Sequence, residues 1–214
     1  MTTEAGSRRF NEVLERSGIE PLDAEIAAKF ENYVSLILRW NRRVNLTSIR
    51  TEDAIISIHL AECIACARAI PEDVRALLDF GSGAGLPGIP IALCRPEITV
   101  TLAESTGKKA AFLQEAVRSL GIKATVHPDR AETLGTVFDC VSLRAVDKMP
   151  KAVAAAAKLV APGGWLALMT TNAGLAGLQA AAGPGFSWSG LQALPNAVDR
   201  ILAFGNRQIE QRGG

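Results

Sequence analysis

The chain lacks three features that would each assign it to a class at once: a second close cysteine pair, a strong net charge and a long apolar run. Among its 4 cysteines, Cys63 and Cys66 form a Cys-x-x-Cys pair, whereas Cys94 and Cys140 stand far apart. A zinc site needs a second close pair, so we expect no metal. The close pair lies in an apolar helical run, which favours buried thiols in a reducing compartment.

The formal net charge of the 214 residues is only +1, so any nucleic-acid binding must use a local patch. The N-terminal segment Met1–Arg9 is polar and lacks the apolar core of a signal peptide. No run approaches the roughly 18 uncharged apolar residues of a membrane span. We therefore expect a cytoplasmic protein with no membrane partner, and we take it to be a monomer.

The residues that often serve as nucleophile and base are not paired in this sequence. No Ser-His-Asp or Cys-His arrangement is evident. His59 lies in a helical run and His127 precedes Pro128, and we interpret both as structural. The sequence therefore assigns no catalytic residue.

The first 70 residues have a helical pattern. Between Leu22 and Arg42, apolar residues recur at steps of three and four, which predicts one buried stripe on a helix. We predict a short helix over 10–17, and a further helix from Thr51 to Ala69 that is stopped by Pro71. Residues 1–70 are therefore expected to form an N-terminal helical region, followed by a second domain over 71–214.

From residue 71 onward, apolar strands alternate with helical segments. This order predicts right-handed βαβ units and a doubly wound, mainly parallel α/β sheet of seven strands. No long helix is predicted between the last two strands, which favours an antiparallel strand at the sheet edge. The glycine-rich stretch 174–185 is either a loop or a weak helix, and Pro162–Gly164 is read as a turn before a strand. Strands are predicted over 75–80, 98–104, 123–127, 138–143, 164–170 and 199–205, with a weaker one over 186–194, and helices over 88–94, 107–120 and 147–160.

A glycine-rich turn follows the first predicted strand. Gly81, Gly83 and Gly85 come directly after Asp79, and an apolar helical run follows them. Glycine permits positive φ and lets a ligand approach the backbone, and a helix N-terminus there favours a nucleotide. Leu86 occupies the third-glycine position of the dinucleotide fingerprint. The pattern instead resembles the first motif of class I S-adenosylmethionine-dependent methyltransferases. A glycine turn without a ligand is the alternative.

Acidic and basic residues follow three later strands. Glu104 ends the second strand, where a carboxylate can accept both ribose hydroxyl hydrogens of an adenosine moiety, or simply favour a helix N-terminus. In class I methyltransferases the loop corresponding to 129–132 usually holds the adenine ring, although a solvated turn is an equal alternative here. Arg144 ends the fourth strand beside the topological switch point, where ligands bind in such sheets. Burying its charge is costly unless it is paired, which favours a functional role.

These segments together resemble the glucose-inhibited division protein B family, bacterial methyltransferases that modify guanine N7 in 16S ribosomal RNA. The resemblance runs from about residue 30 to 204, and its Gly-Leu-Pro-Gly-Ile-Pro run with an upstream Asn-Leu-Thr is specific to that family. The matching segments are 40–41, 45–47, His59, 79–90, 104–105, 107–109, 112–113, 130–132, 144–145 and Arg200.

The resemblance implies S-adenosyl-L-methionine as cofactor, bound by a set of cleft residues. The set implied by the family is Gly81, Leu86, Ala131, Glu132 and Arg144, to which we add Gly83 and Glu104 because of their places after the first two predicted strands.

The chain also departs from the family pattern. Glu62 and Cys63 stand where an Asp-Ser pair is usual, Leu143 where Ser is common, and Met169 where a lysine is often found.

Guanine N7 carries a lone pair and no hydrogen, so it needs no general base, in agreement with the missing acid–base pair. Positioning and electrostatics would then carry catalysis. We expect 16S rRNA or the small ribosomal subunit as partner, with Arg42, Arg43, Lys108 and Lys109 facing the RNA. The alternatives are a methyltransferase of a small molecule or protein, and a non-catalytic module that binds the cofactor.

Overall fold

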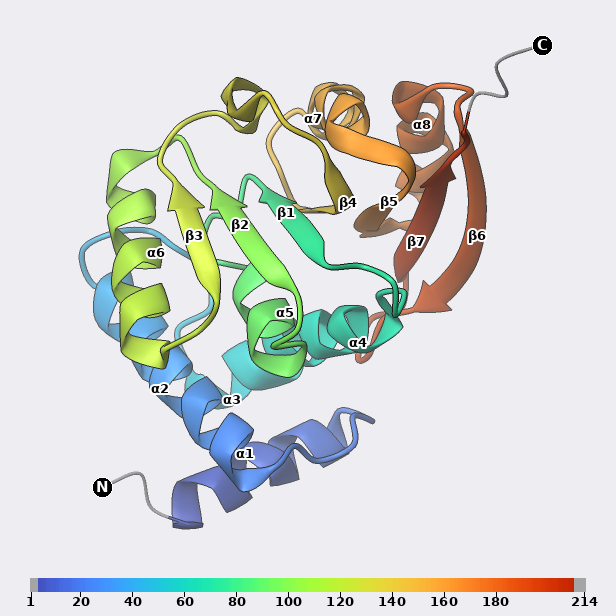
Figure 1. The fold of residues 1–214 in the computed structure, drawn as a ribbon. Coiled ribbons are helices and arrows are strands. Elements are labelled where there is room, and N and C mark those ends of the chain that lie inside the picture. The colour runs from blue at the N-terminus through green and yellow to red at the C-terminus, as the bar shows by residue number, and fades with distance from the viewer. Residues whose placement is uncertain (1–3, 210–214) are drawn as a thin grey trace, which may run out of the picture.

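The computed structural model describes residues 4–209 and contains one seven-stranded sheet between two layers of helices (Figure 1). The strand order is β3-β2-β1-β4-β5-β7-β6. Strands β1 to β5 pair in parallel, while β7 runs antiparallel to both β5 and the edge strand β6. The predicted fold class is thereby confirmed. The strands are β1 (Ala76–Phe80), β2 (Thr99–Ala103), β3 (Ala124–His127), β4 (Phe138–Arg144), β5 (Val160–Thr171), β6 (Phe186–Ala193) and β7 (Arg200–Arg207).

Every helix or turn of helix before β1 lies in the region predicted to be helical. The predicted helix over 51–69 is continuous, but its middle is a π-helical segment, η1, in which the backbone bulges outward. That bulge was not predicted; His59 lies within it and contacts Arg144 of β4. The elements are α1 (Glu4–Arg16), α2 (Ala24–Asn41), α3 (Glu52–Ala54), η1 (Ile55–Leu60) and α4 (Ala61–Ala69).

Two hydrophobic clusters lie on opposite faces of the sheet, because neighbouring residues of a strand point to opposite faces. Leu77 belongs to the cluster formed with α1, α2, α4, α5 (Gly88–Cys94) and α6 (Gly107–Leu120). Leu78 belongs to the cluster formed with η2 (Ala131–Leu134), α7 (Met149–Ala156), η3 (Ala157–Leu159) and α8 (Asn172–Ala182). Figure 1 shows α7 and α8 on one side of the sheet and α2, α4 and α5 on the other.

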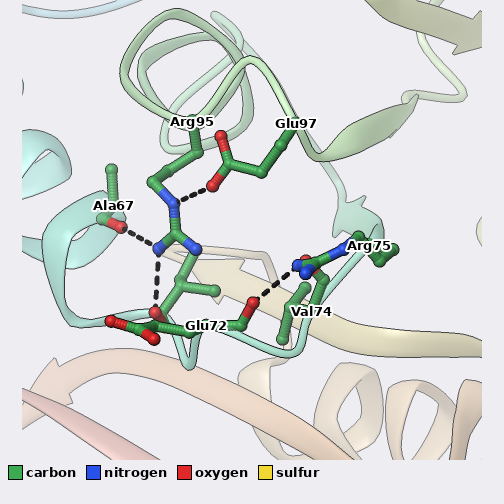
Figure 2. Close-up of polar contacts among 7 residues, drawn as sticks. Ala67, Glu72, Val74, Arg75, Arg95 and Glu97 are labelled. Carbon is green, nitrogen blue, oxygen red and sulfur yellow. Dashed lines mark hydrogen bonds and ion pairs between the residues drawn. The ribbon is translucent and has the colours of Figure 1, made fainter.

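The N-terminal helices are fastened to the sheet layer by polar contacts as well as by packing. Arg95, at the end of α5, donates to the carbonyl oxygens of Ala67 and Ile70 at 3.3 and 2.9 Å and pairs with Glu97 (Figure 2). The buried hydroxyl of Tyr33 in α2 donates to the carbonyl of Ala84 in the glycine turn. Arg95 thus holds the end of α4 near the amino-terminal edge of the sheet, and Tyr33 holds α2 against the glycine turn at the carboxyl-terminal edge.

Two local predictions in the second half were wrong or incomplete. Pro162–Gly164 is not a turn before a strand, because β5 already begins at Val160 and passes through these residues with a register shift against β4. A Cβ on Gly164 would lie 2.8 Å from the carbonyl oxygen of Asp139, so glycine allows the bulged strand to pass β4 closely. The stretch over 174–185 is mostly helical, as α8. None of the described helices has the length and apolar character needed to cross a membrane.

Candidate functional site

A cleft of about 740 Å³ opens at the carboxyl ends of β1, β2 and β4, within the usual range for ligand pockets. This is the switch point, where β1 is flanked by β2 on one side and β4 on the other. The structure brings to its wall every residue that the sequence proposed for the cofactor. These are Gly81, Gly83, Leu86, Glu104, Ala131, Glu132 and Arg144.

The glycine turn has the conformation that its sequence suggested. Gly81, Gly83 and Gly85 have φ angles of 72°, 56° and 82°, in the region that favours glycine. At Gly85 space is also limiting, since a Cβ there would lie 2.5 Å from the side chain of Ile89. Substituting any of the three would therefore strain the turn.

Asp79 holds this turn from beneath. Its buried carboxylate accepts the backbone N–H of Gly88 at 3.2 Å and the hydroxyl of Ser142 at 2.9 Å. Burial raises the pKa of Asp79 to about 6, although the hydrogen bonds oppose that rise. Asp79 therefore ties the last residues of the turn to β4 without facing the cleft.

Glu104 follows β2 and joins the glycine turn to the start of α6. Its two carboxylate oxygens accept the backbone N–H groups of Gly83 at 2.9 Å and Thr106 at 2.7 Å. The side chain lines the cleft although the residue is only 7% exposed. A carboxylate has about four acceptor positions, so Glu104 keeps capacity for the two hydroxyl groups of a ribose.

The turn after β3 forms the next part of the wall. Ala131 and Glu132 of η2 line the cleft, together with Asp129 and Arg130. The ring of His127 lies 2.7 Å from the hydroxyl of Thr133 and braces this loop from within. The loop thus offers a small apolar surface at Ala131 flanked by polar side chains.

The opposite end of the cleft is formed by side chains from distant segments. Arg144 donates through Nη2 to Nδ1 of His59 at 2.9 Å and to Glu62 at 3.1 Å. Glu62 also forms an ion pair with Arg200 of β7 at 2.7 Å, and Nε2 of His59 lies 2.8 Å from the hydroxyl of Thr47. We call these five residues the polar network. It links the N-terminal helices to β4 and β7.

Charge and burial in the polar network decide the state of His59. Burial, followed by the nearby Arg144 and Arg200, lowers the pKa of His59 to about 4. The ring is therefore neutral at pH 7. Nε of Arg144 is buried without a hydrogen-bond partner among the described residues, and Arg144 lines the cleft.

Sequence reasoning missed two residues of this wall. It interpreted His59 as structural and gave Thr47 no role, yet both line the cleft. Their only signal was that each lies in a segment matching the family.

The predicted RNA-facing cations lie on two adjoining surfaces. Arg42, Arg43 and Lys108 line a groove of about 610 Å³ between the end of α2 and α6, whereas Lys109 lines the cleft. We call the former the basic groove. Its floor includes Trp40, whose indole N–H donates to Glu115 at 3.0 Å, and Arg39, which pairs with the same carboxylate. No ion pair involves the four predicted cations within residues 4–209.

Comparison with known protein sequences gives matches that carry one family description. The family model described as rRNA small subunit methyltransferase G matches residues 26–181. A protein of Xanthomonas oryzae pv. oryzae named "Ribosomal RNA small subunit methyltransferase G" is 41% identical over 153 residues, which cover 70% of this chain and 71% of that protein. A protein of the same name from Stenotrophomonas maltophilia is 41% identical over 151 residues, covering 69% and 70% of the two chains.

Solved structures share the fold at low sequence identity. An O-methyltransferase family protein from Burkholderia thailandensis aligns with a TM-score of 0.60 at 13% identity, over 88% of this chain and 73% of that one. A ribosomal protein L11 methylase from Lactobacillus delbrueckii subsp. bulgaricus aligns with a TM-score of 0.59 at 12% identity, over 71% and 79%. Both alignments show that this chain shares their α/β fold.

Proposed function

The chain belongs to the rRNA small subunit methyltransferase G family, and on that premise we propose that it transfers a methyl group from S-adenosylmethionine to N7 of a guanine in 16S rRNA. The observation that carries the proposal is the cleft, whose lining includes every proposed cofactor residue. The polar network contributes Thr47, His59 and Arg144 to that cleft, and Lys108 of the basic groove is next in sequence to Lys109 of the cleft.

The residues of the cleft fit S-adenosylmethionine chemically. Glu104 offers acceptors to a ribose, and Ala131 offers an apolar surface to an adenine ring. Arg144 keeps a buried Nε donor without a partner among the described residues, which suits a carboxylate. When bound, the cofactor supplies an electrophilic methyl group on a sulfonium.

The protein's own contribution is then positioning rather than proton transfer. Guanine N7 presents a lone pair and no hydrogen, so the new N–C bond forms without loss of a proton. The base gains the positive charge that the sulfonium loses as its S–C bond breaks. A cleft that holds both groups in line and excludes water lowers the barrier through orientation and preorganised electrostatics.

The approach of the RNA would use the two cationic surfaces together. Lys109 lies in the cleft, and Lys108 beside it lies in the basic groove with Arg42 and Arg43. A strand whose target base enters the cleft would thus have its flanking phosphates near these cations, which position a backbone without reading its sequence.

The test is methyl transfer to the natural particle. Purified protein is incubated with methyl-labelled S-adenosylmethionine and small subunits from cells that lack the corresponding gene. We expect label in one guanine of 16S rRNA, and chemical cleavage at 7-methylguanosine should locate it. Naked 16S rRNA and subunits from wild-type cells serve as comparison substrates.

The same assay separates the alternatives. Label on a ribosomal protein or small molecule would favour a different methyltransferase. Tight binding of S-adenosylhomocysteine by calorimetry, with no transfer to rRNA in any assembly state, would favour a non-catalytic module and overturn the proposal.

A further inference from the structure

The hydrogen bonds of the polar network have only one consistent direction. An arginine guanidinium donates and never accepts, so Nδ1 of His59 must accept the hydrogen from Arg144 at 2.9 Å. A neutral imidazole that accepts at Nδ1 carries its hydrogen on Nε2. Nε2 of His59 therefore donates to the hydroxyl oxygen of Thr47, 2.8 Å away.

The partners of the Thr47 hydroxyl likewise determine where its own hydrogen can be donated. Its oxygen already accepts from His59 and from the backbone N–H of Ile49 at 3.2 Å. A hydroxyl has two acceptor positions and one hydrogen, so the hydrogen must be donated elsewhere. Within residues 4–209 no acceptor for it lies at hydrogen-bond distance, and Thr47 lines the cleft.

The position of this hydroxyl is also fixed by the backbone around it. Oδ1 of Asn41, the last residue of α2, accepts the N–H groups of Leu46 and Thr47 at 2.9 and 3.1 Å. Its amide nitrogen donates to the carbonyls of Thr47 and Ile49 at 3.0 and 3.1 Å. The segment that carries Thr47 is thus held on both sides by one side chain.

We propose that Thr47 is a specificity-determining residue whose hydroxyl donates a hydrogen bond to O6 of the target guanine. His59 and Arg144 act as positioning residues that fix the direction of that bond. The inference rests on the proposed function, since it deepens the choice of base within the same cleft.

The chemistry of the purine edge supports this choice. Beside N7, guanine presents the acceptor O6, whereas adenine presents an amino group at that position. A fixed donor therefore accepts guanine and meets a second donor in adenine. Because O6 becomes a weaker acceptor when N7 gains positive charge, we expect the contact to contribute to substrate binding, and hence to KM more than to kcat.

The first experiment is a double-mutant cycle, in which one change is made in the enzyme and the other in the target base. Small subunits are reconstituted with ligated 16S rRNA that carries guanine or 2-aminopurine at the target; the latter keeps N7 and lacks O6. Thr47→Val, which removes the donor, and the matched Thr47→Ser, which keeps it, are compared with the wild type. For the wild type we expect kcat/KM to fall about tenfold with 2-aminopurine, mainly through KM.

The decisive result is whether the effect of the enzyme substitution depends on the presence of O6 in the base. On guanine, Thr47→Val should lose about tenfold and Thr47→Ser about twofold or less, while on 2-aminopurine Thr47→Val should lose nothing further. Penalties that multiply to about a hundredfold would show that Thr47 does not contact O6 and would overturn the proposal. Calorimetry with S-adenosylhomocysteine should give the same affinity for the three proteins.

The second experiment needs no variant of the network. The chain has only 2 histidines, so ¹⁵N spectra of imidazole-labelled protein resolve His59 once His127→Gln identifies the other ring. We expect the Nε2–H tautomer of His59 at neutral pH. The Nδ1–H tautomer or a charged ring would remove the basis of the proposal.

Failure of the proposed function looks different from failure of this inference. If wild-type enzyme transfers no label to any rRNA guanine, the function itself is wrong. If it transfers label and the cycle is uncoupled, or the tautomer is reversed, only the role of Thr47 is wrong.

Discussion

The two ends of the cleft are built by different means. The end around Gly83, Glu104 and Ala131 consists of turns that each follow directly after one strand, held largely by backbone groups. The end around Arg144 is the polar network, in which side chains separated by 82 and 85 residues make the decisive contacts. The first end is held mainly through backbone N–H groups, whereas in the polar network the loss of one side chain leaves its buried partners without a hydrogen bond.

The largest effect is expected where the polar network carries its buried cation. Arg144→Met leaves the 2% exposed carboxylate of Glu62 with Arg200 alone. We expect a loss of about 3 kcal/mol in the free energy of unfolding, measured with urea, because a buried partner has been removed. Methyl transfer should fall about a hundredfold or more, since the target end of the cleft loses its alignment.

A second substitution tests whether this loss is only structural. Adding Glu62→Gln to Arg144→Met removes the uncompensated carboxylate, so stability should largely return while methyl transfer does not. Recovery of both would mean that Arg144 acts through folding alone, and the contrast between the two ends would lose its functional meaning.

At the backbone-built end, the carboxylate of Glu104 accepts two backbone N–H groups. Glu104→Gln should weaken binding of S-adenosylhomocysteine about thirtyfold in calorimetry, because charge-assisted hydrogen bonds contribute about 1.5–3 kcal/mol. The matched control is Glu97→Gln at the other end of β2, where the exposed carboxylate pairs with Arg95. An equal loss in both variants would exclude a specific role for Glu104.

The basic groove should produce a smaller effect that depends on salt. Reversing Arg42 and Arg43 to Glu is expected to weaken binding to the small subunit about tenfold and to make its salt dependence less steep. Affinity for S-adenosylhomocysteine should stay unchanged. The control is Arg16→Glu, which reverses the charge of an exposed residue of α1 that lines neither the cleft nor the basic groove. Unchanged RNA affinity would exclude this groove from the RNA path.

The smallest effect concerns the pH dependence of stability. Two buried groups, Asp79 and His59, have pKa values that are shifted in opposite directions. The pKa of Asp79 is raised from 3.8 to about 6, mainly by burial, so its stabilising contribution is present below pH 4 and lost as pH rises through 6. The pKa of His59 is lowered from 6.5 to about 4, so its contribution is present above pH 6.5 and lost as pH falls toward 4.

Unfolding in urea between pH 4 and 6.5 can separate the two. Relative to wild type, the stability of Asp79→Asn should rise with pH, and that of His59→Gln should fall, each by about 1–3 kcal/mol across the window. Asparagine still has groups for both partners of Asp79, so that variant should fold. Difference curves of the same sign would contradict the assigned burial of one group.

The sequence predicted those residues of the site whose chemistry and position directly after a strand both indicate a role. Gly81 and Glu104 follow strands directly, so their place at the carboxyl edge follows once the strands are recognised. Arg144 was found by the same reasoning. Thr47 and His59 were not, because a residue on a surface loop and a residue in an apolar helix give no local sign that they join one network with Arg144 of β4.

The strand pattern also predicted most of the fold and failed where packing overrides local preference. Pro162–Gly164 has the composition of a turn, yet it lies within β5 because Gly164 can pass the carbonyl of Asp139 at a distance that no side chain would allow. The π-helical bulge over Ile55–Leu60 likewise has no local signal.

Thus the order of residues alone specified the alternating strands and helices, the glycine turn and the acid after β2, since each depends on neighbours in the chain. The tertiary structure determined the direction of the hydrogen bonds in the polar network. Only when α2, η1, β4 and β7 pack together does the guanidinium of Arg144 meet the ring of His59, and that contact, by forcing the ring to accept, sets the direction of every hydrogen bond up to Thr47.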